Sequence, residues 1–154
     1  MFKQHADVIE GIAFSPNGRS LVSQSNDQSV RIWNLRDGSS KVLPLTGGSS
    51  LFISVAFSPD GRYIAGGNFD RLLWTWESRS YTLVAKWLGH TDCVRHIEFS
   101  PDGKLLMSGS DDGAVKCWDV TSLGTGSEPQ NFADIRAFSG RKVPFFSGIL
   151  LITC

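Results

Sequence analysis

The sequence has little that would mark a disulfide-stabilised, metal-binding or secreted protein. Its three cysteines, Cys93, Cys117 and Cys154, lack the spacing of a metal site or a redox motif. Cys117 lies inside a predicted strand, so a buried, reduced thiol is expected. No secretory signal and no Asn-x-Ser/Thr acceptor is present. We therefore predict no metal, no cofactor and an intracellular chain.

Net charge and long apolar runs are also lacking. Fifteen basic residues balance fifteen acidic ones, and the pI is about 6.8. This balance removes the usual electrostatic case for direct binding to nucleic acid or to an anionic membrane. The apolar tail Val143–Cys154 is shorter than the roughly 20 residues that span a bilayer. Partners are therefore expected among other proteins or peptides.

What the sequence does contain is an internal repeat. Its markers return at intervals of 43 and then 42 residues, and a period of about 40 is typical of four-stranded propeller blades. The markers are the turn FSPNGR/FSPDGR/FSPDGK at Phe14–Arg19, Phe57–Arg62 and Phe99–Lys104, the aspartates Asp27, Asp70 and Asp112, and the tryptophans Trp33, Trp76 and Trp118.

Alternating apolar residues between turn signals predict strands and almost no helix. A Pro and a Gly at fixed positions favour a tight turn between the first and second strand of each copy. The expected strands are Ile9–Phe14, Leu21–Ser25, Val30–Trp33 and Lys41–Leu45, then Leu51–Phe57, Tyr63–Gly66, Leu72–Trp76 and Tyr81–Leu88, with Ile135–Phe138 as the outer strand of the third copy.

The predicted fold is all-β, with about three four-stranded antiparallel sheets and a partial fourth, forming an incomplete propeller. Such an array leaves its terminal faces and edges uncovered, so we expect self-association through unpaired blades. The predicted units are a remnant strand at 1–4, repeats at 5–46, 47–88 and 89–138, the last with a polar linker at 121–130, and a degenerate or truncated fourth repeat at 139–154.

The third copy, Thr91–Val120 with Gly89-His90 before it, resembles the WD-repeat (WD40) family most completely. The resemblance implies a hydrogen-bonded tetrad of His, Ser, Asp and Trp in each blade. Copy two keeps only Asp70 and Trp76, because Gly48 and Gly66 occupy the His and Ser positions. The complete sets are His5, Ser23, Asp27 and Trp33 in copy one, and His90, Ser108, Asp112 and Trp118 in copy three.

The tetrad has a structural interpretation and a catalytic one. A buried Trp and a buried Asp both need partners, because an unsatisfied buried polar group costs about 1–3 kcal/mol. Ser, His and Asp together also invite comparison with a hydrolase. The Ser lies mid-strand, however, and the set recurs one repeat earlier, whereas an active site seldom duplicates in register with a fold. We therefore predict a structural tetrad and no enzymatic activity.

The resemblance also implies a narrower loop face that binds partners, formed by two positions of each copy. Ile53 and Phe69 are apolar where a solvated loop would favour polar residues. They either form a protein-binding patch or pack against neighbouring loops. The six predicted partner-binding residues are Glu10, Ile53 and Arg95, with Asn26, Phe69 and Asp111 beside them.

Within the family, the segment from Asp60 to Gly124, with the linker and IRAFSG after it, resembles fungal Tup/Groucho-type transcriptional corepressors. That resemblance implies a non-enzymatic interaction scaffold in the nucleus. Those corepressors also have an N-terminal coiled coil, which this sequence lacks. The alternative is the substrate-recognition subunit of a ubiquitin ligase or another multiprotein scaffold. A ligase subunit would need an adaptor helix that this sequence does not show.

Overall fold

The computed structural model describes residues 3–45, 51–124 and 131–136, the last range as backbone. These ranges contain twelve strands in three four-stranded antiparallel sheets and no helix, which confirms the predicted fold class. The strands are β1 Ile9–Phe14, β2 Ser20–Ser25, β3 Val30–Asn34 and β4 Ser40–Val42 in the first blade, β5 Phe52–Phe57, β6 Tyr63–Asn68, β7 Leu72–Glu77 and β8 Leu83–Leu88 in the second, and β9 Val94–Phe99, β10 Leu105–Ser110, β11 Ala114–Asp119 and β12 Asn131–Arg136 in the third.

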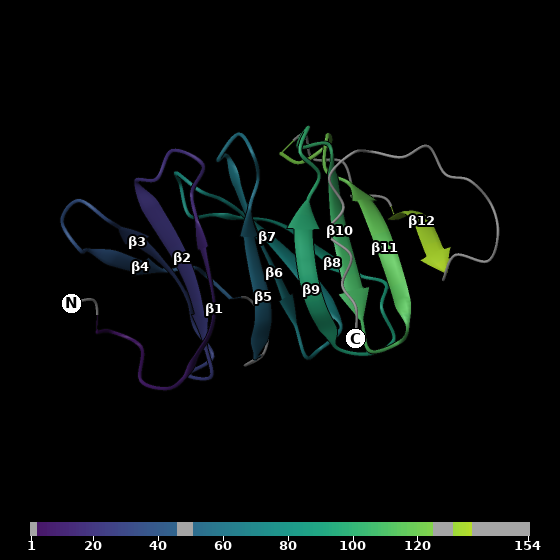
Figure 1. Ribbon diagram of the computed structural model, residues 1–154, viewed down its shortest axis with the longest axis horizontal. Coiled ribbons are helices and arrows are strands. Elements are labelled where there is room, and N and C mark those ends of the chain that lie inside the picture. The colour runs from purple at the N-terminus through teal and green to yellow at the C-terminus, as the bar shows by residue number, and fades with distance from the viewer. Residues whose placement is uncertain (1–2, 46–50, 125–130, 137–154) are drawn as a thin grey trace.

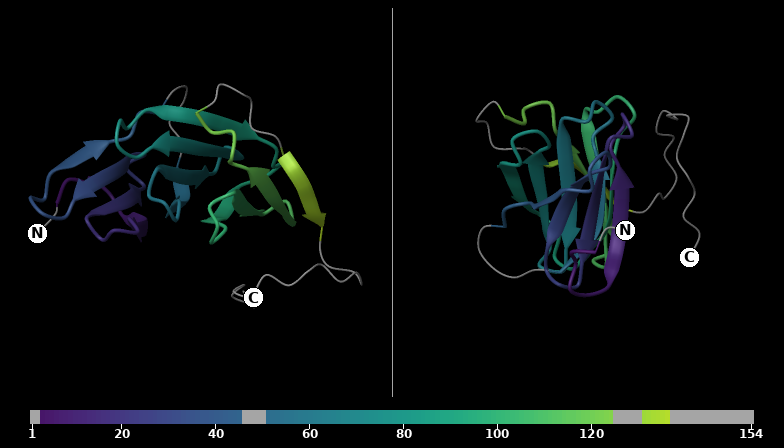
Figure 2. Two further views of the ribbon diagram at one scale, coloured as in Figure 1. Left: turned by 90° about the horizontal axis from the view of Figure 1, so that it is seen from above. Right: turned by 90° about the vertical axis from the view of Figure 1, so that its left-hand side faces the viewer.

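The three blades stand side by side in an open arc (Figure 1). Within each blade the strands follow chain order, so every connection is a simple hairpin. The first strands β1, β5 and β9 are neighbours along the concave side, and the fourth strands lie toward the convex side (Figure 2). The described blades therefore form part of a propeller ring.

The first turn of each blade has the same local chemistry. Gly18, Gly61 and Gly103 have φ of 66°, 71° and 69°, which is the left-handed region where glycine carries no steric penalty. The Ser before each Pro donates its hydroxyl to the Asn or Asp side chain two residues later. The turns predicted from the Ser-Pro-Asn/Asp-Gly pattern are therefore present in all three blades.

Three outer strands differ from their predicted limits. β4 ends at Val42, before Pro44, which has no N–H to donate to a ladder. β8 begins only at Leu83, because Tyr81 has φ of 61° and belongs to the preceding turn. β12 is Asn131–Arg136 instead of Ile135–Phe138, since its register with β11 pairs Ala114 with Arg136. The predicted segment at 139–154 lies outside the described residues.

The hydrophobic core lies between neighbouring blades. Leu43 of blade one belongs to the same buried cluster as Phe52, Trp74 and Trp76 of blade two. Trp87 of blade two stacks on Trp118 of blade three, with ring centroids 5.5 Å apart. Each blade is thus stabilised chiefly by the next one along the chain.

In the described part of the chain, no helix is long and apolar enough to cross a membrane.

Candidate protein-binding surface

The first strand of each blade contains a β-bulge near its start. β1 pairs Ile9 with Ser25 and then Gly11 with Gln24, so Glu10 has no opposite residue. Ile53 in β5 and Arg95 in β9 are unpaired in the same way. A bulge re-aims the side chain of its extra residue. This explains physically why the three predicted positions point to one end of the blades.

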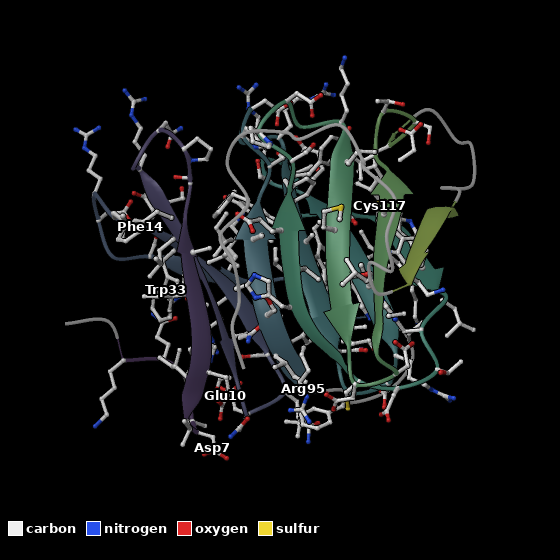
Figure 3. The ribbon with its side chains drawn as sticks, turned by 45° about the vertical axis from the view of Figure 1, so that its right-hand side comes forward. Asp7, Glu10, Phe14, Trp33, Arg95 and Cys117 are labelled. Carbon is white, nitrogen blue, oxygen red and sulfur yellow. The ribbon has the colours of Figure 1, made fainter. Side chains whose placement is uncertain are left out.

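The turn between the second and third strand lies beside each bulge. The backbone N–H groups of Asn26, Phe69 and Asp111 donate to the carbonyl oxygens of Val8, Leu51 and Cys93, at 2.9, 3.0 and 3.0 Å. These bonds fix each turn residue next to the bulge residue of its own blade. The structure thus brings all six predicted partner-binding residues to one end of the molecule. Figure 3 labels Glu10 and Arg95 there, with Asp7.

The side-chain pairs differ between blades. In blade one, the Asn26 amide donates to the Glu10 carboxylate at 2.9 Å. In blade three, the Arg95 guanidinium donates to Asp111 at 2.8 Å, and this bond lowers the pKa of the Asp111 carboxyl. In blade two, the pair is the apolar Ile53 and Phe69. In each polar pair the two side chains hydrogen-bond to each other, whereas the side chains of Ile53 and Phe69 form no hydrogen bond.

Phe69 is 44% exposed, and the guanidinium of Arg95 lies 5.4 Å from its ring centroid. Ile53 is half-buried. Phe69 therefore packs against a neighbouring blade, as one interpretation of the pair predicted. Its ring is also exposed to solvent, as a protein-binding patch requires. An aromatic ring held by a cation–π contact is ordered before a partner arrives.

The sequence analysis missed two features of this end. Val8 and Ile9 are exposed apolar residues next to Glu10. The exposed carboxylates outnumber the basic groups of Arg71 and Arg95, which makes the rim acidic although the whole chain is neutral; these carboxylates are Asp7, Glu10, Asp70, Asp92 and Asp111. The sequence alone could have shown this excess of acidic residues only if each turn had first been assigned to this end of the blades.

Asp92, Cys93 and Asp111 bring ligand atoms within 4.8 Å of one another. Burial raises the pKa of the Cys93 thiol, and the guanidinium of Arg95 already binds the Asp111 carboxylate. A metal ion would meet a protonated thiol and a neutralised carboxylate, so this group is a poor metal site.

Behind this surface, His, Ser, Asp and Trp are connected in blades one and three. His90 Nδ1 lies 2.8 Å from Asp112 Oδ2, and His90 Nε2 lies 2.7 Å from Ser108 Oγ. The indole N–H of Trp118 donates to Ser108 Oγ at 2.8 Å. In blade one the corresponding distances among His5, Asp27, Ser23 and Trp33 are 2.9, 2.6 and 2.7 Å.

Donor and acceptor capacities set the direction of this relay. An indole can only donate, so Trp118 gives its proton to Ser108 Oγ. The hydroxyl proton of Ser108 then points to His90 Nε2, which accepts it, so the ring N–H lies on Nδ1 and donates to Asp112. Each of the three donated protons in this row of hydrogen bonds thus has one acceptor. The relay ties the second-turn Asp to the strand-three Trp and so holds the turn that carries Asp111.

Blade two does not form the tetrad. Trp76 is buried, but its indole N–H donates to the backbone carbonyl of Pro44 in blade one at 2.9 Å. Asp70 is exposed, and within the described ranges its carboxylate has no hydrogen-bond partner. Asp70 and Trp76 are thus present without the relay that the other two blades have, because Gly66 supplies no hydroxyl to link them. The position of Gly48 lies outside the described residues.

The buried hydroxyl does not resemble a nucleophile. Ser108 is 1% exposed, and its oxygen is engaged by both Trp118 and His90. A nucleophilic serine needs an approachable oxygen beside an oxyanion hole. The arrangement fits a structural support and offers a substrate no route to the hydroxyl.

Acid is expected to destabilise the fold through these aspartates. Burial alone would raise the pKa of Asp112, but N–H groups of Thr91 and Ala114 and the His90 ring outweigh it and lower that pKa to about 2. Similar hydrogen bonds lower the pKa of Asp27. A carboxyl with a depressed folded-state pKa contributes stability above its unfolded pKa of about 3.9 and loses it as pH falls. Stability should therefore drop between about pH 4 and pH 2.

Urea denaturation at a series of pH values measures this drop. Asp112→Asn should flatten it, while Asp70→Asn, at the matching exposed position of blade two, should leave it unchanged. An equal slope in wild type and Asp112→Asn would contradict the assignment.

The geometry agrees with known proteins. The family model described as WD domain, G-beta repeat matches residues 1–34, 40–77 and 81–119. Each match ends just after the strand-three Trp. The second and third matches begin at or just before β4 and β8, the fourth strands of the preceding blades, so the sequence repeat and the blade are offset by one strand.

Curated relatives match over part of the chain. "WD repeat and SOCS box-containing protein 1" is 37% identical over 81 residues in Danio rerio, which is 52% of this chain and 19% of that protein. Its counterpart in Homo sapiens is 35% identical over 80 residues, or 51% and 19%. The matched segment is thus about a fifth of the length of these relatives.

Solved structures match over most of the chain. The crystal structure of RRP9 WD40 repeats superposes with a TM-score of 0.75 at 29% identity, over 79% of this chain and 38% of that one. The structure of U3-55K gives the same TM-score and identity, over 79% and 39%. The repeats, the blade geometry and the family match together show that this chain belongs to the WD repeat (WD40) family.

Proposed function

We propose that this chain is a scaffold whose bulge-and-turn surface binds a partner protein through a segment with an apolar side chain next to Lys or Arg. The observation that carries the proposal is the difference between blades. Two blades fill the paired positions with hydrogen-bonded polar residues, and the middle blade fills them with Ile53 and Phe69.

The chemistry of the surface supports this choice of partner. An exposed aromatic ring with an apolar neighbour can anchor one buried side chain. The acidic rim then favours basic residues on either side of that anchor and repels nucleic acid. The cation–π contact from Arg95 holds Phe69 in place, so little side-chain entropy remains to be lost on binding.

The relatives favour a role for the scaffold in a ubiquitin ligase over a role in a transcriptional corepressor. Their names join WD repeats to a SOCS box, a ubiquitin ligase adaptor, which favours substrate recognition in a ubiquitin ligase. No relative described above is a Tup/Groucho-type corepressor, and a nuclear location follows only from the corepressor interpretation. We therefore place ligase substrate recognition ahead of corepression.

A displayed random-peptide library tests the surface directly. Selected peptides should share an apolar residue flanked by Lys or Arg, and their affinity should fall as salt rises. Phe69→Ala, Ile53→Ala and Arg95→Ala should each weaken binding by about tenfold, or about 1.4 kcal/mol, with little change in Tm. Leu88→Ala, an exposed apolar residue on β8, is the matched control.

Two results would contradict the proposal. Binding that survives all three substitutions but is lost in a folded Val84→Asp variant would move the site to the outer strands. Selected peptides that are acidic would overturn the charge argument. Affinity purification from the source cell separates the two settings, because ubiquitin-ligase subunits and repressor-complex subunits are distinct sets.

A further inference from the structure

One face of blade one is apolar, and none of the described residues covers it. In blades two and three, the first strand packs on the blade before it: Val94, Ile97 and Phe99 are buried in the core shared with blade two. The equivalent residues of β1 are Ile9, Ile12 and Phe14, and they are 49%, 58% and 64% exposed. We call these three residues the leading face. Figure 3 places Phe14 at the free end of the arc.

Blade three presents the complementary surface. In blade two, Tyr63, Ala65 and Leu73 are buried in the core shared with blade three. Their equivalents in blade three are Leu105, Met107 and Val115, which we call the trailing face. Val115 is 42% exposed, and Leu105 and Met107 are half-buried. The three described blades therefore end in two surfaces, the leading face and the trailing face. Residues equivalent to these two faces pack against each other at both junctions between the described blades.

The first turns of the blades give independent evidence for the same pairing of surfaces. A Cβ on Gly61 would lie 3.5 Å from Cδ of Pro16, and a Cβ on Gly103 would lie 3.6 Å from Cδ of Pro59. The first turn of one blade thus touches the first turn of the blade before it. A Cβ on Gly18 would have no described atom within 4 Å, and Pro101, the equivalent of Pro16 and Pro59, is exposed.

We propose that the leading face of one chain binds the trailing face of a second copy, and that two copies close head to tail into a six-bladed ring. Pro101 of one copy then lies against Gly18 of the other, as Pro16 lies against Gly61. A head-to-tail contact makes a ring when its rotation closes. Propeller rings contain about 4–8 blades, and the three described blades of each of two copies together supply six, which lies within that range.

The new junction is more polar than the internal ones. His96 stands where Ser54 accepts a hydrogen bond from the backbone N–H of Ile97 at 3.1 Å, and an imidazole nitrogen can accept from Ile12 in the same way. Glu98 stands at the position of Ala56, which packs against the core. An exposed carboxylate there weakens the contact, so the dimer dissociates more readily than the blades separate.

Sedimentation velocity of the full chain over a wide concentration range tests the ring. We expect a monomer–dimer equilibrium with a dimer of twice the 16.9 kDa chain. Phe14→Asp and Val115→Asp should each raise the dissociation constant by at least about tenfold, as expected for truncating a central apolar anchor. Glu98→Ala, which restores the residue of blade two, should lower it. Leu88→Asp, at an exposed apolar position outside both faces, should have no effect.

Mixing the two Asp variants distinguishes head-to-tail from symmetric pairing. In an equimolar mixture, the unaltered leading face of the Val115→Asp variant can bind the unaltered trailing face of the Phe14→Asp variant, so 1:1 dimers should form. If dimers instead formed by pairing two leading faces, the mixture should contain no 1:1 dimers of the two variants. Circular dichroism and Tm report whether each variant is folded. A monomer at all concentrations, dimers that tolerate Val115→Asp, or growth into open polymers would each overturn the proposal. Closure of either face by other residues of the same chain would give the first of these results.

Discussion

Replacing Trp118 with alanine is expected to lower the free energy of unfolding by about 3–5 kcal/mol, the range for removing a buried aromatic side chain. Trp118 is almost fully buried, stacks on Trp87 of the neighbouring blade and donates its N–H to Ser108. The substitution therefore removes an inter-blade contact and leaves the Ser108 oxygen without its donor. Blades two and three should come apart first.

Two further variants divide that loss into its parts. Trp118→Phe keeps an aromatic ring in the contact and removes only the N–H. Ser108→Ala keeps the indole and leaves both it and His90 without the hydroxyl. Each should cost about 1–3 kcal/mol, the penalty for orphaning buried polar groups. Urea denaturation followed by circular dichroism measures all three. A loss below about 1 kcal/mol for Trp118→Ala would show that the inter-blade contact contributes little.

Introducing serine at Gly66, the position where blades one and three have Ser23 and Ser108, is expected to destabilise the protein by about 2 kcal/mol or more. Forcing extra atoms into a packed core costs about 1–3 kcal/mol. A buried hydroxyl without its histidine adds a penalty of about 1–3 kcal/mol. Sequence comparison alone suggests the opposite, a repaired tetrad and a more stable blade.

The reason lies in what surrounds Gly66. A Cβ there would lie 2.8 Å from Cδ1 of Phe52 and 3.2 Å from Cζ3 of Trp76. Blades one and three have the smaller Ile9 and Val94 at the position of Phe52, which leaves room for a serine. In blade two the Phe52 ring takes that space and packs against both Trp74 and Trp76.

Gly109→Ser is the matched control, since Gly109 lies in the same strand of blade three and a Cβ there would meet nothing within 4 Å. Urea denaturation should show a loss of stability for Gly66→Ser and little change for Gly109→Ser. A gain of stability in Gly66→Ser would mean that Phe52 can move aside and that the tetrad can be rebuilt.

The two classes of glycine show how far sequence reasoning reaches. The Gly of each Ser-Pro-Asn/Asp-Gly turn was predictable, because local backbone geometry requires a positive φ there. Gly89 was noted only as part of the Gly-His pair. Its reason is tertiary, since a Cβ on it would lie 2.5 Å from Cη2 of Trp118.

The same division holds for the candidate surface. The repeat period placed Glu10, Ile53 and Arg95 at equivalent positions, but nothing in their sequence marks them as bulge residues. A bulge is a property of two paired strands and appears only when the register is known.

By itself the sequence determined the repeat, the hairpin order and the turns, because these depend on period, alternation and local φ preferences. The two complete tetrads were implied by the resemblance of the repeats to the WD-repeat family. Only the tertiary structure decided that Trp76 bonds Pro44, that Asp70 stays in solvent and that Phe69 lies beneath Arg95. It also decided that Ile12 and Phe14 are exposed while their equivalents in blade three, Ile97 and Phe99, are buried. The physical reason is that burial in a propeller comes from the neighbouring blade, so identical local patterns meet different surroundings at the ends of the array.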